Sequence, residues 1–385
     1  MKKIFLTTIT LLTMASASVF GMYGVDTDWI NFLTHGNQFR ARLDQLGFTL
    51  GNDTIKGTFG FDNNMNYGGA YGGLLVDNEP TGKHRSSWVP SISMGIGYTS
   101  SVIGIGVGYS MNIGDQIQKF NGKAESKTVN KSAHTPVLVL NAMDNAFRMA
   151  IPIQVYVNND KFDGGGYNNE MAVSVDSQFR YYTGLDALPQ VRLFLRYGLY
   201  QNESKATKDA EKEKQKYAES FGFDFRLYFG SMVEEVALQP LVKLAYNQAL
   251  GNYHQDTKVE AVKAMNGDYN SYQSGSYGGS VWDLQLMTGL GLTANSDIVS
   301  LYLEPQLGLA VTSRAPIVAT APGTPTPARV TTESYSLAYN VYAEIYITPL
   351  KNLEWYFEAQ LGSGANQNSL VFNGTTGITW YLPAL

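Results

Sequence analysis

The chain has 385 residues and a formal net charge of −5, and only 16% of its residues are charged. It contains no cysteine, which excludes disulfides, thiolate metal sites and cysteine nucleophiles. The lack of a basic excess argues against a nucleic-acid-binding protein. Few charges together with 39 glycines and 25 tyrosines favour a β-protein of a membrane.

The N-terminus has the organisation of a secretory signal peptide. Two lysines precede an apolar run from Ile4 to Met14, and small residues follow. The run is too short for a helix that spans a bilayer, and a buried N-terminal helix is the alternative. Cleavage after Ala17 or after Gly21 fits the pattern, and we favour a signal peptide over residues 1–21. We therefore expect an exported protein.

Apolar and polar residues then alternate with a period of two, as in Val191–Tyr197 and Phe221–Phe229. Such alternation predicts β-strands, because successive side chains leave opposite faces of a sheet. The predicted strands are 54–61, 88–98, 102–110, 135–141, 147–157, 171–182, 190–200, 220–229, 236–247, 281–293, 298–311, 334–347, 353–362 and 374–382.

Long and short connections alternate between these strands. The long ones are 62–87, 111–134, 158–170, 201–219, 248–280, 312–333 and 363–373. Long external loops, short periplasmic turns and an even strand count are typical of outer-membrane barrels. The sequence therefore predicts an all-β fold, a transmembrane antiparallel outer-membrane β-barrel over residues 54–385. We expect about 14 strands, within a range of roughly 12 to 16 because Phe48–Leu50 could pair as well.

Tryptophans and the last strand add to the barrel prediction. Trp88 and Trp282 open strands at the predicted outer rim, while Trp355 and Trp380 lie near the inner rim, where aromatic girdles occur. The pattern Thr375-x-Gly377-x-x-Trp380-x-Leu382 matches the loose C-terminal signal that bacterial barrel-assembly machinery reads. It departs from that signal in lacking a terminal phenylalanine.

Residues 22–53 form a different segment, with apolar residues at helical spacing. We predict a short broken helix over about 27–46, which Gly47 can end. It could enter the barrel as a plug, with Arg40 and Arg42 meeting acidic side chains of the lumen. A helix that caps the periplasmic end is the alternative.

Placing the apolar partners of each strand against lipid assigns the charged residues to the lumen. This set comprises Arg148, Asp176, Arg180, Arg192, Arg196, Asp224, Arg226, Lys243, Asp283, Glu304, Glu344, Glu354 and Glu358. The bases gather on the strands between 147 and 247, and the strands after 281 contribute acids alone. Two opposed arcs of charge create a transverse field, as in the narrow part of general porins. A closed polar network that pairs across the lumen is the alternative.

Three histidines, His84, His134 and His254, fall in predicted external loops. Neither a serine nucleophile nor a metal motif such as H-E-x-x-H accompanies them, so we interpret them as solvated. We expect no catalytic residue, no metal and no cofactor. An outer-membrane hydrolase remains a remote alternative.

Three further stretches have plain structural interpretations. Gly104, Gly106 and Gly108 share one face of a hairpin and precede no helix, so they are not a dinucleotide motif. The charged run Lys205–Lys216 predicts a solvated loop tip, which could be helical. Ala319–Ala328, which contains three prolines, predicts an extended exposed loop.

The start of the predicted mature chain resembles a known family. Met22-Tyr23-Gly24, followed by the stretch from Asp28 to Phe48, is similar to the variable surface proteins of intestinal spirochaetes. The resemblance implies an abundant, multimeric surface antigen of the bacterial outer membrane and supplies no catalytic residues. The expected partners are outer-membrane lipid, the barrel-assembly machinery, further copies of the chain, and host ligands or antibodies at the loops.

We expect one surface-exposed protein that is both a major surface antigen and a porin-like diffusion pore with a charged lumen. A closed barrel that acts only as variable surface antigen or adhesin is the main alternative. The pore predicts conductance, whereas the closed barrel confines function to the external loops.

Overall fold

The computed structural model describes most of the predicted barrel. The described residues are 46–52, 54–63, 90–113, 117–119, 126–128, 131–162, 164–233, 236–251, 254–261, 264, 276–277, 279–314, 317–318, 332–350, 353–363 and 370–380. Outside them lie the signal peptide, the predicted helix up to residue 45, the plug candidates Arg40 and Arg42, Trp88, His84 and Leu382. No helix within these ranges is long and apolar enough to cross a membrane.

One antiparallel sheet of 18 strands contains a counterpart of every predicted strand. These are β2 (Ile55–Asn63), β3 (Pro90–Thr99), β4 (Gly104–Ile113), β7 (Lys131–Ala142), β8 (Phe147–Lys161), β9 (Tyr167–Leu185), β10 (Leu188–Lys205), β11 (Glu213–Tyr228), β13 (Val236–Ala249), β15 (Trp282–Asn295), β16 (Val299–Arg314), β18 (Thr332–Leu350), β19 (Leu353–Ser363) and β20 (Leu370–Trp380). Each of them pairs with the next in chain order. Short strands β5 (Ile117–Lys119), β6 (Ser126–Thr128) and β12 (Ser231–Val233) join this sheet, and β14 (Ser276–Tyr277) pairs with β17 (Ile317–Val318).

The sheet begins earlier than predicted. Residues Leu46–Gly51 form strand β1, which pairs with β2 over its whole length. They belong to the segment 22–53 that was predicted to lie outside the barrel, so that boundary is wrong for Leu46–Gly51, which are part of the sheet. Asn52 closes the tight turn to β2, since its side-chain oxygen accepts hydrogen bonds from the amides of Thr54 and Ile55. Among the described residues, β1 and β20 are the edges of the sheet.

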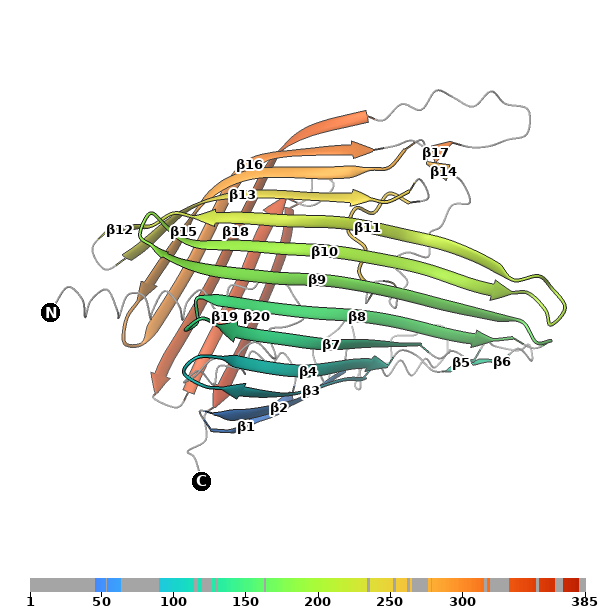
Figure 1. Cartoon of the computed structure of the whole chain (residues 1–385), viewed down its shortest axis with the longest axis horizontal. Helices are drawn as coiled ribbons and strands as arrows, with labels where there is room; N and C mark the ends of the chain where they lie inside the picture. The colour runs from blue at the N-terminus through green and yellow to red at the C-terminus, as the bar shows by residue number, and fades with distance from the viewer. Residues whose placement is uncertain are drawn as a thin grey trace, which may run out of the picture.

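The sheet is strongly curled, and its two faces differ in chemistry. In Figure 1, strands β18, β19 and β20 cross the direction of β8 to β11 steeply. Large apolar side chains are exposed on the outer face, for example Leu244, Leu286 and Leu309, whereas Arg192, Asp224 and Glu304 are buried on the inner face. This is the reverse of a water-soluble protein. It is the distribution of an outer-membrane β-barrel, whose outer face contacts lipid.

Aromatic side chains mark both margins of the outer face. Phe223, Tyr246 and Trp282 follow one another across β11, β13 and β15 near the long-loop end, with ring centroids 6.1 and 6.3 Å apart. Trp355 packs against Phe357 at 4.6 Å close to the short turn between β18 and β19. Rings at these two levels fit the interfaces of a bilayer.

Two predicted loops are mostly strand. The exposed apolar side chains of the outer face form a band around the sheet, which we call the apolar band. Strands β8 to β11 continue past this band, so the predicted connections 158–170 and 201–219 are reduced to residues 162–166 and 206–212. The run Lys205–Lys216 is therefore a short turn followed by the start of β11, and it is not helical. The sequence obscured these extensions because both faces are polar above the membrane, as in the contact of Asn202 with Asn168 at 2.7 Å. The ladder of backbone hydrogen bonds continues where the alternation stops.

Candidate functional site: the charged inner wall

Every charged residue predicted for the lumen in the strands from β8 to β19 lies on the inner face. Arg180, Arg192, Asp224, Arg226, Glu304, Glu344 and Glu354 are buried there. Arg148, Asp176, Arg196, Lys243, Asp283 and Glu358 are partly buried on the same face. Alternation within each strand fixes this placement, since the flanking residues, such as Leu193 and Leu195, face outward.

Strand register aligns five bases in one row across the wall. Arg148 lies opposite Arg180, Arg180 opposite Arg192, Arg192 opposite Arg226, and Arg226 opposite Lys243. Sequence reasoning placed these residues at similar depth, but only the register makes them direct neighbours. Like charges directly opposite each other are destabilising, so the row requires compensating groups.

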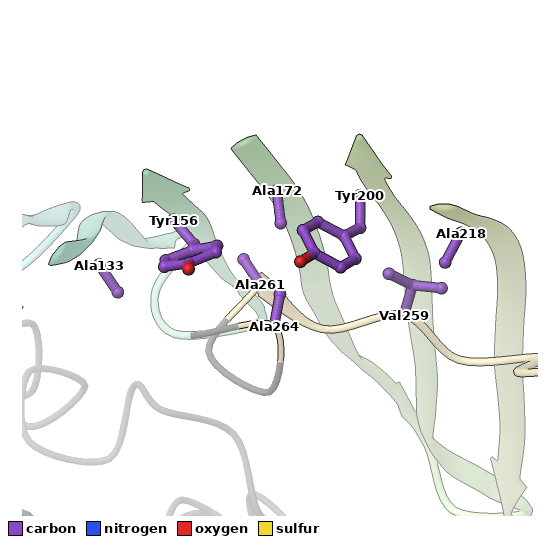
Figure 2. Packing of buried hydrophobic residues seen from close by; sticks show 8 residues of the cluster. All are labelled: Ala133, Tyr156, Ala172, Tyr200, Ala218, Val259, Ala261 and Ala264. Atoms are coloured by element: carbon purple, nitrogen blue, oxygen red, sulfur yellow. The ribbon is translucent and has the colours of Figure 1, made fainter. Parts of the chain in front are cut away.

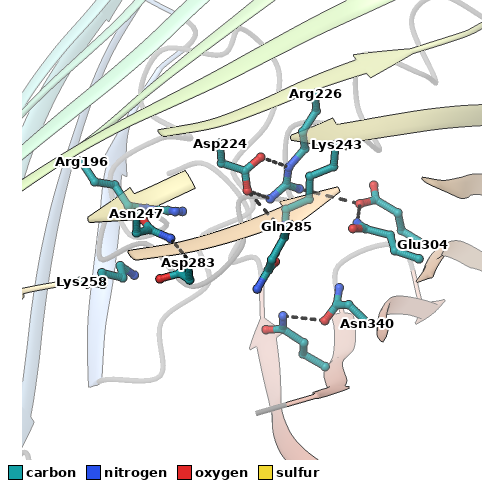
Figure 3. A network of polar contacts seen from close by, with 12 residues as sticks. Arg196, Asp224, Arg226, Lys243, Asn247, Lys258, Asp283, Gln285, Glu304 and Asn340 are labelled. Carbon is teal, nitrogen blue, oxygen red and sulfur yellow. Dashed lines mark hydrogen bonds and ion pairs between the residues drawn. The ribbon is translucent and has the colours of Figure 1, made fainter. Parts of the chain in front are cut away.

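Carboxylates compensate the row at its β11–β13 end. Asp224 accepts two hydrogen bonds from Arg226, both 2.8 Å long, and its Oδ2 lies 3.6 Å from Lys243 Nζ. Arg226 Nη1 also lies 3.8 Å from Glu304 Oε1. Figure 3 shows that Asp224, Arg226 and Lys243 lie close together and that Arg226 approaches Glu304 on the inner face. Buried charge is tolerated here because each carboxylate contacts a cation.

The β8–β10 end of the row has a different environment. Arg192 donates to Gln190 Oε1 at 3.1 Å and stacks over the ring of Tyr228 at 4.4 Å. The Arg148 guanidinium lies 5.1 Å from the ring centre of Tyr182. Aromatic rings and a side-chain amide partly stabilise the positive charge of these guanidinium groups. No carboxylate of the described chain forms an ion pair with Arg148 or Arg180.

Acids and tyrosines form the opposite part of the wall. Glu304 accepts hydrogen bonds from Tyr302, from Gln306 and, at 3.4 Å, from Tyr228. Glu344 and Glu358 lie opposite each other on β18 and β19, and the hydroxyl of Tyr342 is within hydrogen-bond distance of both. A single hydroxyl proton serves one of them at a time. Sequence reasoning missed these tyrosines, although Tyr302 and Tyr342 stand two residues before a predicted lumenal glutamate.

Residues 254–261, together with Ala264, fold back from the long-loop end onto the inner face. Figure 2 shows Val259, Ala261 and Ala264 packed against Tyr156, Ala172 and Tyr200 of the wall. Gly198 makes this approach possible, because a Cβ there would lie 2.1 Å from the carbonyl oxygen of Val259. We call this stretch the infolded segment. It narrows the space on the inner side of β8–β11.

Wall side chains bind the backbone of the infolded segment. Ser220 Oγ accepts a hydrogen bond from the Val259 amide at 2.8 Å, and Ser174 Oγ accepts one from the Ala261 amide at 2.9 Å. Lys258 Nζ lies 3.9 Å from Asp176 Oδ2, which also pairs with Arg196 at 3.1 Å. The segment therefore meets the wall through small side chains, backbone hydrogen bonds and ion pairs.

Two histidines differ from their prediction as solvated loop residues. His134 lies within β7, where its Nδ1 is 2.5 Å from the hydroxyl of Tyr109. His254 is buried at the start of the infolded segment, with Nε2 2.9 Å from the carbonyl oxygen of Glu219. The Asp256 amide donates to its Nδ1 at 3.2 Å. The described residues contain no group of three His, Cys, Asp or Glu side chains that could hold a metal ion.

Acidification should loosen the infolded segment. Burial lowers the pKa of His254 below its ordinary value of 6.5, so the packed ring is neutral near pH 7. Released into water, the ring binds a proton more readily, and protonation therefore favours release. The stability that the neutral ring contributes is complete above about pH 6.5 and is lost as the pH falls through the lowered pKa.

Limited proteolysis within residues 254–261 measures this effect at about pH 7.5 and about pH 5.5. We expect faster cleavage at the lower pH for the wild-type protein. His254→Gln is the control, because it keeps a polar side chain and cannot titrate. If the ratio of the cleavage rate at the lower pH to that at the higher pH were the same in the wild type and in His254→Gln, the role of His254 would be contradicted.

Strands β9 to β11 rise above the apolar band as a polar hairpin stack, and in Figure 1 they reach furthest towards the long-loop end. Near its tip, Tyr167 donates to Glu203 Oε1 at 2.8 Å, and Lys212 and Lys214 each lie 3.3 Å from this carboxylate. These contacts, the Tyr167 hydrogen bond foremost, lower the pKa of Glu203 to about 2. The tip therefore keeps its arrangement of charges at acidic pH.

Comparison with known proteins identifies a single family for nearly the whole chain. A family model described as "Serpulina hyodysenteriae variable surface protein" matches residues 2–381. The comparison with curated proteins gives no match. Among solved structures, a chain titled "Copper transporter OprC" aligns with a TM-score of 0.36 and 9% identity. That alignment covers 87% of this chain and 62% of the other.

Proposed function

Because this chain belongs to the Serpulina hyodysenteriae variable surface protein family, and is thus a surface-exposed outer-membrane protein, we propose that it is also a porin-like diffusion pore. In the same proposal, its loops and the polar hairpin stack are exposed at the cell surface and act as the antigen. In this proposal the long-loop end faces the surroundings of the cell and the short turns face the periplasm.

The separation of charge on the inner wall carries the pore proposal. A closed network that served stability alone would alternate acids and bases, because opposite charges attract and like charges opposite each other repel. Here five bases follow one another from β8 to β13, and Glu304, Glu344 and Glu358 lie on β16 to β19. In an open lumen these opposed rows set up a transverse field that selects ions by their charge.

The infolded segment adds support for this proposal. It lies against the wall rather than over the rim, with Ala261 fully buried against β8–β11. A loop in this position narrows a channel and brings its own charges to the inside, as Lys258 and Glu260 do here. A barrel that served only to display loops has no use for such a segment.

Reversing charge on the basic part of the wall should change ion selectivity. We expect the refolded wild-type protein to give steady current steps in a planar bilayer. In Arg192→Glu/Arg196→Glu, the reversal potential in a salt gradient should shift towards greater cation permeability, because two lumenal cations become anions. Lys214→Glu is the control, since it makes the same change per residue on an exposed side chain of the polar hairpin stack.

Unchanged selectivity in the double variant would contradict the role of the basic row. A folded, heat-modifiable protein that passes no current would contradict the pore and leave the antigen role. That role predicts that antibody recognition depends on the turn 206–212 and on the connections 250–281 and 315–331. Retained recognition after their deletion would count against it.

A further inference from the structure

Five nitrogen atoms of four side chains on β8, β9 and β10, near the short-turn end of the inner wall, lack a hydrogen-bond acceptor in the described part of the chain and do not belong to Arg192. They are Arg148 Nε, Arg148 Nη1, Arg180 Nη1, Gln178 Nε2 and Gln190 Nε2. The side chains that bear them come from the adjacent strands β8, β9 and β10. Arg180, Gln178 and Gln190 are 6%, 5% and 1% exposed.

The register brings these donors together. Arg180 lies between Arg148 and Arg192 in the cross-strand row. Gln178 precedes Arg180 by two residues on the same face of β9, and Gln190 precedes Arg192 in the same way on β10. We call the four side chains of Arg148, Arg180, Gln178 and Gln190 the donor cluster. Its members supply donors in excess of acceptors, because guanidinium groups carry donors only.

Buried donors of this kind are costly when unmatched. Each unsatisfied buried donor loses its hydrogen bond to water, and the guanidinium groups of Arg148 and Arg180, which lie opposite each other, also repel one another. Asp224 relieves this cost for Arg226, but it lies at the other end of the row. The missing component must therefore accept several hydrogen bonds and carry negative charge.

We propose that the donor cluster binds a small oxyanion of the phosphate type. Phosphate oxygens match the fork of donors on a guanidinium group, and two forks from neighbouring strands can hold one anion together. Gln178 lies beside the arginine row towards the long-loop end, and Gln190 lies beside it towards the short-turn end, so each supplies a further donor from its own side of the row. The site lies on the inner wall, so the anion comes from solution and not from the surrounding lipid. Binding does not require conduction, and the inference goes beyond the proposed pore.

Thermal unfolding of the refolded full chain in detergent tests this site. Inorganic phosphate is titrated against sodium chloride at constant ionic strength and pH. We expect phosphate to raise the unfolding temperature of the wild-type protein, because a ligand that binds only the folded state stabilises it. In Arg180→Gln, and independently in Arg148→Gln, the phosphate concentration for half the effect should rise about tenfold or more.

The change in unfolding temperature that Arg180→Gln causes in chloride alone distinguishes this proposal from a purely structural role of the arginines. Arg180→Gln removes a repelling charge that has no acid partner among the described residues, so the variant should be as stable as the wild type or more stable. Lys214→Gln, an equal charge change on an exposed side chain, should keep the wild-type phosphate response. An arginine needed only for folding would instead lower stability in chloride.

Two results would overturn the proposal. One is equal stabilisation by phosphate and chloride in the wild type, which would also result if a carboxylate of the chain itself fills the cluster. The other is an unchanged phosphate titration in both arginine variants. Neither result bears on conductance, and a protein that is silent in bilayers but shows the phosphate response would contradict the pore and leave the oxyanion site standing.

Discussion

Replacing Gly198 by alanine should detach the infolded segment from the wall. The new methyl group would lie 2.1 Å from the carbonyl oxygen of Val259, a distance at which backbone must move. Overpacking of this kind costs about 1 to 3 kcal/mol. This cost converts to about a fivefold to 150-fold rise in the detached population. The strand itself tolerates alanine, so the barrel should still fold.

The absence of cysteine from the chain allows a direct measurement. A single Ala261→Cys substitution introduces one thiol at a fully buried position of the segment. We expect its rate of modification by a water-soluble maleimide to rise about fivefold or more when Gly198→Ala is added. Bilayer conductance of Gly198→Ala alone should rise as well, if the segment narrows the proposed pore.

Gly291→Ala is the matched control. Gly291 also lies on the inner face, but a Cβ there would be at ordinary contact distance, 3.4 Å from the Cβ of Gln239. The control should leave both the labelling rate and the conductance at wild-type values. Equal labelling rates in the Gly198 variant and the control would contradict the packing of the infolded segment against Gly198.

Removing the charge of Asp224 should cause the largest loss of stability of any single substitution on the wall. The side chain is almost fully buried, pairs with Arg226 through two hydrogen bonds and lies near Lys243. Asp224→Asn leaves these cations without their main counter-charge. Breaking one side of a buried ion pair costs about 3 to 5 kcal/mol, which denaturant unfolding of the refolded protein measures.

A double-mutant cycle shows whether this loss belongs to the pair. Adding Arg226→Gln to Asp224→Asn removes the stranded cation, so the double variant should regain most of the lost stability. Asp209→Asn, an equal charge change on an exposed residue of the 206–212 turn, should leave the unfolding midpoint unchanged. Additive losses in the double variant would show that Asp224 and Arg226 are not coupled.

The strands were predictable from the sequence because lipid on one side and polar groups on the other impose a strict period of two. Val191 to Tyr197 keeps this period, and β10 contains it at the predicted face. Prediction failed where that constraint ends. Lys205 and Glu213 lie above the apolar band, where either face of a strand can be polar, so the pattern could not distinguish a tall hairpin from a loop.

The side-chain face of each wall residue followed from the sequence, but the contacts did not. Which residue lies opposite Arg180 depends on the register of three strands, and a shift by two residues preserves the alternation while it changes every partner. The infolded segment left no sequence pattern, because its packing surface consists of Val259, Ala261 and Ala264. Such residues are common in any loop, and the glycine that receives them is far away in sequence.

The way in which the infolded segment is held has a consequence for how the sequence can diverge. Ser174 and Ser220 bind amide groups of the segment, and every amino acid except proline has an amide hydrogen. Substitutions within the segment can therefore alter its chemical character without moving it, provided that the side chains against the wall stay small. In this way a family of surface proteins can vary the side chains inside the barrel while the strands that bind the infolded segment stay the same.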